Sequence, residues 1–241
     1  IIPLQQFGFR ANSSCESALI SATNSWLQAI DSGAYVGALL VDLAKAFDTI
    51  SHQRLVDELQ EIGVGTDSLL WFITFLENRT QRVKLGSVRC ENKNVARGVP
   101  QGSCLSPLLF NIFVRKLPDS CTADSFQFAD DVTTSAADVE ISVVTEKLQD
   151  AFSSLTRFCE DSGLVINISK TQLIIFKSPT RKLPLDYSIQ LGNTTLQPMQ
   201  SVKLLGVHLD RHFTMATHID KVVKKCHGLL GALARATPFL S

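Results

Sequence analysis

Residues 125–135 read SFQFADDVTTS and predict two short strands joined by a turn at Asp130 and Asp131. Upstream, residues 37–42 read GALLVD, a nearly all-apolar run that is typical of a strand buried on both faces and that ends in Asp42. Adjacent acids beside hydrophobic strands are costly, because like charges repel and a buried carboxylate needs a partner. A bound Mg²⁺ ion would remove both costs, since it prefers carboxylate oxygens. A turn that merely contains two acids is the alternative, and the spacing alone leaves both open.

The periodicity of the rest of the chain predicts helices and strands in mixed order. Helices are expected at 13–32, 51–62, about 139–161 and about 216–235. Two more helices are expected to begin at Thr66 and at Ser106, with Thr66 and Ser106 as their N-caps. Strands are expected at 80–88, 172–177, 187–191 and 202–207. This order lacks regular alternation of strand and helix, so it favours an α+β fold with an antiparallel sheet. Ser51 and Asp48 are the residues expected to cap the 51–62 helix. We expect burial for the apolar residues after Thr66 and for those of the last helix, namely Ile219, Val222, Val223, Cys226, Leu229, Leu230 and Leu233.

The composition is that of a folded protein. Hydrophobic residues make up 45% and charged residues 19% of the 241 residues, which excludes a disordered chain. The apolar runs are far shorter than the ~20 residues that a membrane helix needs, and no secretory signal is visible. The first residue is Ile rather than Met, so we expect a piece of a longer protein. The cysteines lie far apart without zinc-ligand spacing, so we expect reduced, buried thiols and an intracellular protein.

The charges are balanced overall but unevenly distributed. The chain has 23 Lys and Arg residues against 23 Asp and Glu residues. Residues 79–97 and 203–235 are basic, whereas residues 119–161 are mostly acidic. Two basic stretches around an acidic one fit a phosphate-binding surface around a carboxylate site. Ordinary solvated faces would produce the same pattern.

Six stretches of the chain resemble, in order and spacing, the sequence motifs of reverse transcriptases. FADD at 128–131 resembles the Tyr/Phe-Ala-Asp-Asp box, LLVDLAKAFDTISH at 39–52 motif A, and RGVPQGSCLSPLLFNIF at 97–113 motif B. QFGFRANSSCESAL at 6–19 resembles the helix before motif A, SGLVINISKTQLIIF at 162–176 motif D, and KLLGVHLD at 203–210 the primer-grip motif E. The motifs are similar to those of non-LTR, LINE-type retrotransposons, and they cover nearly the whole chain. The sequence is therefore identified as a member of this family.

The resemblance implies a fold and a function. The implied fold is a right-hand polymerase palm with an antiparallel sheet, partial fingers and the start of a thumb. Residues 1–33 would be the remainder of the fingers, 34–211 the palm with a fingers insertion at about 51–97, and 212–241 the start of the thumb. The implied function is RNA-directed DNA polymerase, a nucleotidyltransferase that adds dNTPs to a primer 3′-OH by two-metal phosphoryl transfer. Its partners would be an RNA template, a DNA primer and dNTPs, without a membrane, and its place of action the nucleus.

The resemblance also assigns the residues of catalysis. Asp42, Asp130 and Asp131 match the metal ligands of the family, with the Leu43 carbonyl beside them, and Asp131 would coordinate less directly than the other two acids. The implied cofactor is a pair of Mg²⁺ ions, for which Mn²⁺ can substitute. Lys170 matches the motif D lysine, which is the suspected general acid toward pyrophosphate.

Further residues match the parts that bind nucleotide and nucleic acid. Phe47 matches the aromatic that blocks the sugar 2′ position, and Gln101 and Gly102 match the loop that contacts the incoming nucleotide and the template. The nucleic-acid contacts are expected at Arg79, Arg82 and Lys84 of a basic stretch and at Leu205 and Gly206 of the primer-grip motif. The structural alternative for the basic residues is a solvated edge strand that carries charges. The structural alternative for Phe47 is an aromatic residue of the core.

Two functions remain open from the sequence: a reverse transcriptase core, or a non-catalytic nucleic-acid-binding relic or domesticated domain with the same fold. Decay would affect the metal ligands without penalty, so their presence favours the polymerase. The box reads FADD where many relatives have YADD, which removes only a hydroxyl. Basic finger residues and an endonuclease would lie outside this stretch, so the resemblance leaves open whether the segment is active alone.

Overall fold

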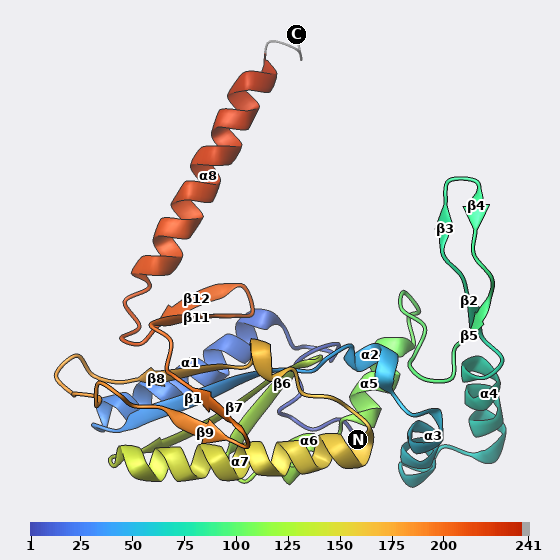
Figure 1. Ribbon diagram of the computed structural model, residues 1–241, viewed down its shortest axis with the longest axis horizontal. Coiled ribbons are helices and arrows are strands. Elements are labelled where there is room, and N and C mark those ends of the chain that lie inside the picture. Colours follow the sequence, from blue (N-terminus) through green and yellow to red (C-terminus); the bar gives the residue numbers. More distant parts are fainter. Residues whose placement is uncertain (238–241) are drawn as a thin grey trace.

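A four-stranded antiparallel sheet forms the centre of the computed structural model, which describes residues 1–237 (Figure 1). Its strands lie in the order β6 (Asp124–Phe128), β7 (Asp131–Asp138), β1 (Tyr35–Asp42) and β8 (Gln172–Phe176). β1 is flanked on both edges and covered on both faces, which explains its nearly unbroken apolar sequence. The predicted hairpin around Asp130 and Asp131 and the predicted α+β class are confirmed.

The two faces of the sheet are covered by different elements. Leu39 and Val41 of β1 belong to the larger core, together with residues of α7 (Ile141–Ser162), α5 (Ser106–Phe113) and α6 (Leu117–Ser120). Val36 and Ala38 belong to a second core with α1 (Cys15–Asp31) and the hairpin of β11 (Ser201–Leu204) and β12 (Val207–Asp210). Alternate residues of β1 therefore point to opposite layers, as the period of a strand requires.

The helices begin and end close to the predicted positions, with two differences in capping. Ser14 caps α1 and Ser51 caps α3 (His52–Glu61) through their side chains. Gly65, rather than Thr66, is the N-cap residue of α4 (Thr66–Leu76). Ser106 is the first residue of α5 and donates its hydroxyl to the Pro100 carbonyl, so it ties the preceding loop to the helix instead of capping it.

The predicted strand at 80–88 is wrong, because this segment folds back on itself. Its pieces are β2 (Thr80–Gln81), which pairs with β5 (Lys93–Asn94), and β3 (Lys84–Leu85), which pairs with β4 (Val88–Arg89). Together residues 80–94 form a ribbon that rises from α4, away from the sheet (Figure 1). Its side chains are all exposed, so the alternation in its sequence does not reflect a buried face.

The predicted burial of α4 is confirmed on one side of the helix only, where Leu69, Phe72 and Phe75 are half-buried against the larger core. Only Leu76 of this helix is buried, whereas Leu70 and Trp71 are 57% and 54% exposed. α4 packs on α3 at the end of the molecule, and no other element covers its far side in the part of the chain that the structure describes. Trp71 instead stacks on Phe75 of the same helix, with ring centroids 5.6 Å apart.

The last helix, α8 (Ala216–Ala236), buries none of the residues expected to be inside. The expected core residues Ile219, Val222, Val223, Cys226, Leu229, Leu230 and Leu233 are all exposed. The reason is that α8 projects from the sheet and packs on β12 of the hairpin at its base (Figure 1). The Asp210 carboxylate anchors this base, since it accepts hydrogen bonds from the backbone N–H groups of His212, Thr214 and Met215 and from the Thr214 hydroxyl.

The remaining elements are short. They are α2 (Ala46–Thr49), a 3₁₀ turn η1 (Ile168–Lys170), and the hairpin of β9 (Ile189–Leu191) and β10 (Thr194–Leu196). All six cysteines are free as predicted, but Cys159 is the one that is buried. None of the described helices is both long and apolar enough to cross a membrane.

Candidate active site

Asp42 and Asp131 lie directly opposite each other in the sheet. Asp42 is the last residue of β1, Asp131 is the first residue of β7, and the two are paired in the antiparallel register. Directly opposed residues project from the same face. Because Leu39 and Val41 fill the core beneath α7, the alternation of β1 sends Asp42, and with it Asp131, to the other face. The hydrophobic pattern of the strand thus brings the two predicted ligands together.

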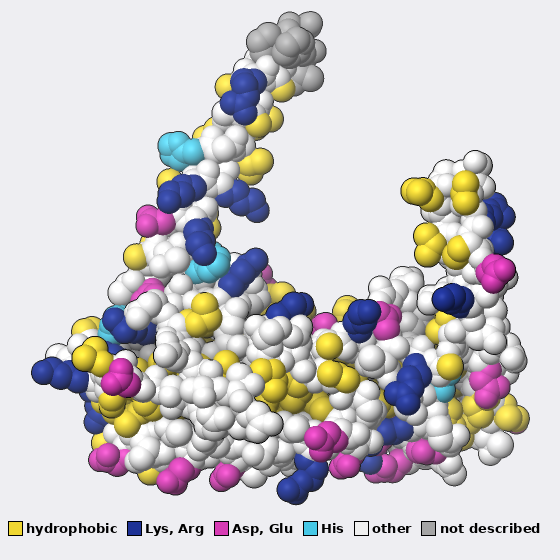
Figure 2. Space-filling view, viewed as in Figure 1, with side chains coloured by type: hydrophobic (Ala, Val, Ile, Leu, Met, Phe, Trp, Pro, Cys, Tyr) yellow, Lys and Arg dark blue, Asp and Glu magenta, His cyan; other side chains and the backbone are white. Residues whose placement is uncertain are grey.

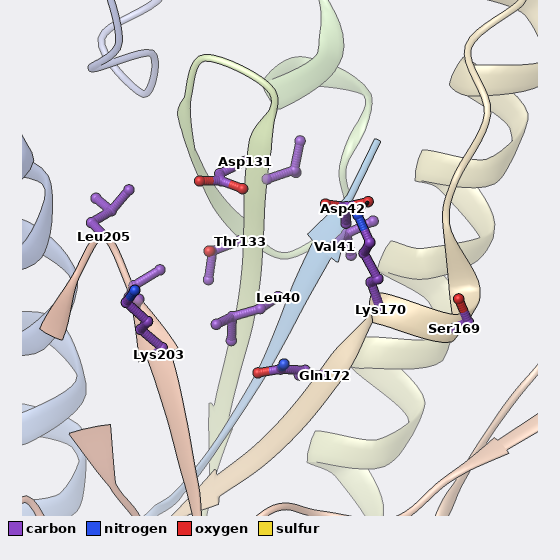
Figure 3. A pocket seen from close by; sticks show the side chains of 12 residues that line it. Leu40, Val41, Asp42, Asp131, Thr133, Ser169, Lys170, Gln172, Lys203 and Leu205 are labelled. Atoms are coloured by element: carbon purple, nitrogen blue, oxygen red, sulfur yellow. Dashed lines mark ion pairs between the residues drawn. The ribbon is translucent and has the colours of Figure 1, made fainter. Parts of the chain in front are cut away.

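The two carboxylates line an open cavity of about 370 Å³. Its walls come from β1, β7, β8, β11 and η1, and its polar side chains are those of Asp42, Asp131, Thr133, Ser169, Lys170, Gln172 and Lys203. Figure 3 shows the carboxylates on neighbouring strands, with Lys170 reaching Asp42 from one side and Lys203 and Leu205 on the other. The cavity therefore presents negative charge in the middle and positive charge at its sides.

Lys170 is held near Asp42 by the backbone of its own segment. Asn167 donates its N–H to the Asp42 carbonyl at 2.8 Å, and Ala44 donates to the Val165 carbonyl at 2.7 Å. These bonds bring η1 to the end of β1, where the Lys170 ammonium lies 3.5 Å from an Asp42 carboxylate oxygen. The structure thus brings the predicted general acid and a predicted metal ligand into one ion pair.

The Leu43 carbonyl is the fourth predicted ligand. Leu43 itself is buried and lies opposite Ile166 in an isolated bridge. The hydrogen bonds of this bridge use the backbone groups of its neighbours, and the Leu43 carbonyl accepts none among residues 1–237. Among the described residues, the Leu43 carbonyl oxygen at the end of β1 therefore remains free to act as a ligand.

The electrostatics of the carboxylates fit a cation. Partial burial raises the pKa of Asp131, and the negative charges of Asp130 and Asp42 raise that pKa further. Lys170 pairs with Asp42 and leaves Asp131 without a salt bridge in the described chain. Negatively charged carboxylate oxygens that repel one another are the ligands that a bound divalent cation stabilises. Within residues 1–237, however, no group of three His, Cys, Asp or Glu side chains is already arranged as a metal site.

Asp130 follows Ala129, whose φ of 58° is in the left-handed region. The Asp130 side chain is exposed, does not line the cavity, and takes part in no hydrogen bond or ion pair among the described residues. The resemblance ranks Asp131 behind Asp130 as a ligand, whereas Asp131 is the one that faces Asp42 across the sheet. No structural role within residues 1–237 accounts for the Asp130 carboxylate.

The loop that contains Gln101 and Gly102 is docked on α2. Gly98 donates its N–H to the Ile50 carbonyl, and a Cβ at Gly98 would lie only 2.7–2.8 Å from the Asp48 backbone. Asp48 does not cap the 51–62 helix as predicted, because Ser51 is the cap; its carboxylate instead accepts a hydrogen bond from the Gln101 side chain at 2.8 Å. Gly102, with φ of 87°, is exposed at the tip.

Phe47 of α2 lies between the core and the surface. Its ring stacks on Phe110, with centroids 4.4 Å apart, and meets Phe9 edge-on at 6.3 Å. The side chain is half-buried rather than buried. Phe47 therefore contributes to the core, and part of its ring remains accessible.

Leu205 and Gly206 form the two-residue turn between β11 and β12. Both have positive φ, 46° and 91°, as a tight hairpin turn requires, but a leucine in this conformation is strained. Leu205 lines the cavity (Figure 3), whereas Gly206 does not. The structure thus brings one of the two predicted primer-grip residues to the carboxylates.

Arg79, Arg82 and Lys84 do not line the cavity, since they lie at the base of the ribbon and within it. Arg79 has a structural role: its guanidinium lies over the Phe75 ring at 4.9 Å and donates to the Phe75 carbonyl at the end of α4. Arg82 and Lys84 are exposed. Figure 2 shows a broad hollow between the ribbon and α8, with Lys and Arg side chains along it.

Lys203 begins the basic stretch 203–235, and it is a cavity residue that was not singled out from that stretch by the sequence. It is exposed on β11 between the buried Val202 and Leu204. The alternation of SVKL at 201–204 was the signal, because it separates Lys203 from the core side of the strand. Which face of the hairpin lies beside Asp131 is a matter of tertiary packing.

Comparison with known proteins identifies relatives over most of the chain. The family described as "Reverse transcriptase (RNA-dependent DNA polymerase)" matches residues 1–209. The RNA-directed DNA polymerase from mobile element jockey of Drosophila melanogaster is 28% identical over 229 residues. The probable RNA-directed DNA polymerase from transposon X-element of the same species is 30% identical over 228 residues. Each match covers 92% of this chain and 25% of the relative, so the chain spans about a quarter of the length of these relatives.

Solved structures with a similar fold include telomerases. Apo telomerase from Candida tropicalis has a TM-score of 0.55 and 13% identity, over 88% of this chain and 36% of that one. Telomerase from the same organism in complex with a fragment of telomeric RNA has a TM-score of 0.53 and 14% identity, over 74% of this chain and 32% of that one. At this identity the likeness concerns the fold.

Proposed function

The chain belongs to the reverse transcriptase family, and from this we propose that it is the polymerase core of a LINE-type retrotransposon protein. The proposed reaction is RNA-directed addition of dNTPs to the 3′-OH of a DNA primer. The resemblance to the LINE type is confirmed by the mobile-element relatives, and the right-hand polymerase fold by the telomerase structures. No feature of the described residues favours the non-catalytic alternative.

The observation that carries the proposal is the pairing of Asp42 with Asp131 at the floor of a cavity edged by lysines. Paired carboxylates at the ends of two central strands are unfavourable for folding, because they repel each other without contributing to the core. Bound cations that also coordinate the phosphates of a nucleotide would compensate this repulsion, so the arrangement is that of a binding site. Asp130, which has no hydrogen-bond or ion-pair partner among residues 1–237, adds a third carboxylate next to the pair.

The residues present fit the divalent cations that the family generally uses. We propose two Mg²⁺ ions, or Mn²⁺ in their place, held by the oxygens of Asp42, Asp130 and Asp131 with the Leu43 carbonyl. When bound, such ions supply charge stabilisation for the attacking and the leaving oxygen of phosphoryl transfer. The like charges that raise the pKa of Asp131 are the charges that cation binding would compensate.

Lys170 would act at the leaving group. The primer 3′-hydroxyl releases its proton to water as its oxygen bonds to the α-phosphorus, and the bond from that phosphorus to the pyrophosphate oxygen breaks. In this proposal the Lys170 ammonium donates a proton to the departing pyrophosphate. Its ion pair with Asp42 at 3.5 Å is long and exposed, so it can be exchanged for a phosphate at little cost. Lys203, on the other side of the cavity, adds a second cation near the same phosphates.

The nucleotide and the nucleic acids would be bound around this cavity. Phe47 would contact the sugar, and Gln101 with Gly102 the incoming base pair, from a loop that Asp48 holds in place. Leu205 and Gly206 would position the primer end. Arg82 and Lys84 would contact the template backbone through the hollow of Figure 2, since phosphate contacts need charge but no sequence.

The domain bounds remain part of the proposal. The sheet and its covering helices would be the palm (34–211), and α3, α4 and the ribbon its fingers insertion (about 51–97), with residues 1–33 belonging to the fingers. α8 would begin the thumb (212–241), of which residues 238–241 lie outside the described residues. Action in the nucleus also stays a prediction of the resemblance.

Primer extension on a homopolymer RNA template tests the function, with the chain as given and with a form extended at its N-terminus. Asp130→Asn is expected to abolish incorporation with Mg²⁺ and to leave the melting temperature unchanged, because this carboxylate has no hydrogen-bond or ion-pair partner among residues 1–237. Loss of one metal ligand costs several kcal/mol of transition-state stabilisation.

Asp124→Asn is the matched control. It makes the same chemical change on the same hairpin, at the far end of β6 and outside the cavity, and should leave incorporation as in the parent. Incorporation by Asp130→Asn at the parent rate would refute the assignment of the metal site. Absence of incorporation in both parent forms would refute the proposed function.

A further inference from the structure

A segment at the N-terminus, residues 5–9, lies along the edge of the sheet beside the turn that carries Asp130. We name it the N-terminal strap. Gln6 pairs with Gln127 of β6 in a parallel bridge. The Gln127 N–H donates to the Gln5 carbonyl and the Phe7 N–H donates to the Gln127 carbonyl, both at 2.8 Å. The strap thus extends the sheet by a short strand that ends where β6 enters the turn.

The side chain of Gln6 is buried, with 1% of its surface exposed, and each of its polar atoms has a partner. Its carbonyl oxygen Oε1 accepts the N–H of Gly8 at 2.8 Å and the N–H of Ala129 at 3.1 Å. Its Nε2 donates to the Gln127 side-chain oxygen at 3.1 Å, which fixes which end of the amide faces the turn. Ala129 is the residue with positive φ directly before Asp130.

A left-handed residue other than glycine persists only where its surroundings hold it. The N–H of Ala129 points out of the β6–β7 ladder, and a buried N–H without an acceptor is costly. Gln6 supplies that acceptor from a segment more than 120 residues away in the sequence. The hydrogen bond therefore stabilises the one backbone conformation that turns the chain from β6 into the two acids.

Two further contacts keep the strap against the turn. A Cβ at Gly8 would lie 2.3 Å from the Ala129 nitrogen, so glycine alone permits this approach. The Gly8 carbonyl accepts a hydrogen bond from the buried side chain of Asn111 on α5 at 2.8 Å. The backbone of the strap at Gly8 is thus held beside the turn by close packing on one side and by a helix of the core on the other.

We propose that Gln6 is a positioning residue for the acidic turn. Its side-chain carbonyl fixes the Ala129 amide, and through it the direction in which Asp130 and Asp131 are presented to the metal ions and the primer end. This inference rests on the proposed function for its effect on the reaction, while its effect on the turn can be measured without any reaction.

The test compares three variants of two buried amide side chains, Gln6 and Asn111. Gln6→Met keeps the length of the side chain and removes both the acceptor and the donor. Gln6→Glu keeps an acceptor for the two N–H groups, and Gln127 can turn its side-chain amide, whose nitrogen has no partner among the described residues, toward the second oxygen. Asn111→Leu is the matched control, because it removes a buried amide of α5 that bonds to the same strap and leaves the Gln6 contact to Ala129 in place.

The first measurement is amide hydrogen exchange at Ala129, and the second is Mn²⁺ affinity by electron paramagnetic resonance. Gln6→Met should raise exchange at Ala129 by about fivefold or more, which corresponds to one lost hydrogen bond, and should weaken Mn²⁺ binding. Gln6→Glu should retain the parent exchange. Asn111→Leu should lower the melting temperature without a specific change at Ala129.

The third measurement is steady-state primer extension. A displaced turn should lower kcat by about tenfold or more, since small misplacements of reacting groups are costly, while the KM for dNTP stays near the parent value. Equal effects of Gln6→Met and Asn111→Leu on all three measurements would overturn the proposal, because they would reflect general loss of stability. Unchanged exchange at Ala129 in Gln6→Met would overturn it as well.

If Gln6→Met does not fold, Gln6→Asn decides. This variant keeps the amide but shortens the side chain by one methylene, so its oxygen no longer reaches the Ala129 N–H. Exchange at Ala129 must then still rise, and a parent-like value contradicts the inference. A parent protein that neither binds Mn²⁺ nor extends a primer would refute the proposed function. The exchange measurement would then still decide whether Gln6 holds the turn.

Discussion

Replacement of Phe47 by alanine tests whether this ring selects the sugar or only fills the core. The ring is half-buried, stacks on Phe110 at 4.4 Å and meets Phe9 at 6.3 Å. A fully buried Phe→Ala change costs about 3–5 kcal/mol, so a half-buried ring with one good stacking partner should cost about 2–3 kcal/mol. Phe47→Ala should therefore lower the melting temperature by several degrees and still fold, because a core of this size has other support.

The effect on substrate choice distinguishes the two roles. If the accessible part of the ring lies against C2′ of the nucleotide, its removal makes room for a 2′-hydroxyl, and discrimination by steric exclusion is lost. The ratio of kcat/KM for rNTP to that for dNTP should then rise by at least about tenfold, which is the size expected when a clash worth ~1.4 kcal/mol is removed. Single-nucleotide primer extension with each triphosphate measures this ratio.

Phe110→Leu provides the control for this prediction. Phe110 is fully buried and is the stacking partner of Phe47, so its replacement weakens the same packing by up to about 1.5 kcal/mol and leaves the Phe47 ring in place. It should lower stability without a change in sugar preference. A folded and active Phe47→Ala protein with the parent ratio would refute the gate, and the same shift in Phe110→Leu would show that looser packing is its cause.

Three further predictions concern stability and binding. Partial burial raises the pKa of Asp210, but hydrogen bonds from Thr214, His212 and Met215 outweigh it and hold that pKa below its usual value. A lowered folded pKa gives stability that is present above about pH 4 and lost as the pH falls through the folded pKa, so Asp210→Asn should reduce stability at pH 7 and flatten its acid dependence in thermal melts at pH 7 to 3. Gly98→Ala should lower the free energy of unfolding by about 2 kcal/mol or more, because Gly98 has a positive φ and an added Cβ would lie 2.7 Å from the Asp48 backbone. Gly102 has a similar φ but nothing within 4 Å of an added Cβ, so Gly102→Ala should lower it by only about 1 kcal/mol. Denaturant titrations measure both values. Fluorescence anisotropy should show tighter binding to an RNA–DNA hybrid than to B-form DNA and a steep loss of affinity with salt, and a flat salt response would contradict phosphate binding.

The centre of the fold could be predicted from the sequence because its signals are local. The apolar run before Asp42 and the hairpin around Asp130 and Asp131 gave the strands, and strand alternation accounts for the face on which Asp42 lies. The register that sets Asp42 opposite Asp131 is a long-range property. Motif resemblance, rather than residue chemistry, joined these acids into one predicted site.

The outer elements were predicted less well, because helical periodicity reveals an apolar side but not what covers it. α4 and α8 both have such a side, which in the described chain is only partly buried in α4 and exposed in α8. The contact of Asp48 with Gln101 spans 53 positions, so no local rule could prefer it over a cap. The place of Lys203 beside the two acids and the contact of Gln6 with Ala129 were not predicted for the same reason, since both depend on parts of the chain that are distant in the sequence.

The pairing of Asp42 with Asp131 limits how the length of the chain can vary. One residue inserted in β1 before Asp42 would turn this carboxylate toward α7 and the hydrophobic core, because strand residues alternate between faces. Two inserted residues would restore the face but move Asp42 by about 6.8 Å along the strand, away from its partner. The lengths of β1 and β7 are therefore fixed by the need to keep the two acids opposite each other. The ribbon at 80–94, in contrast, can gain or lose residues without moving the acids.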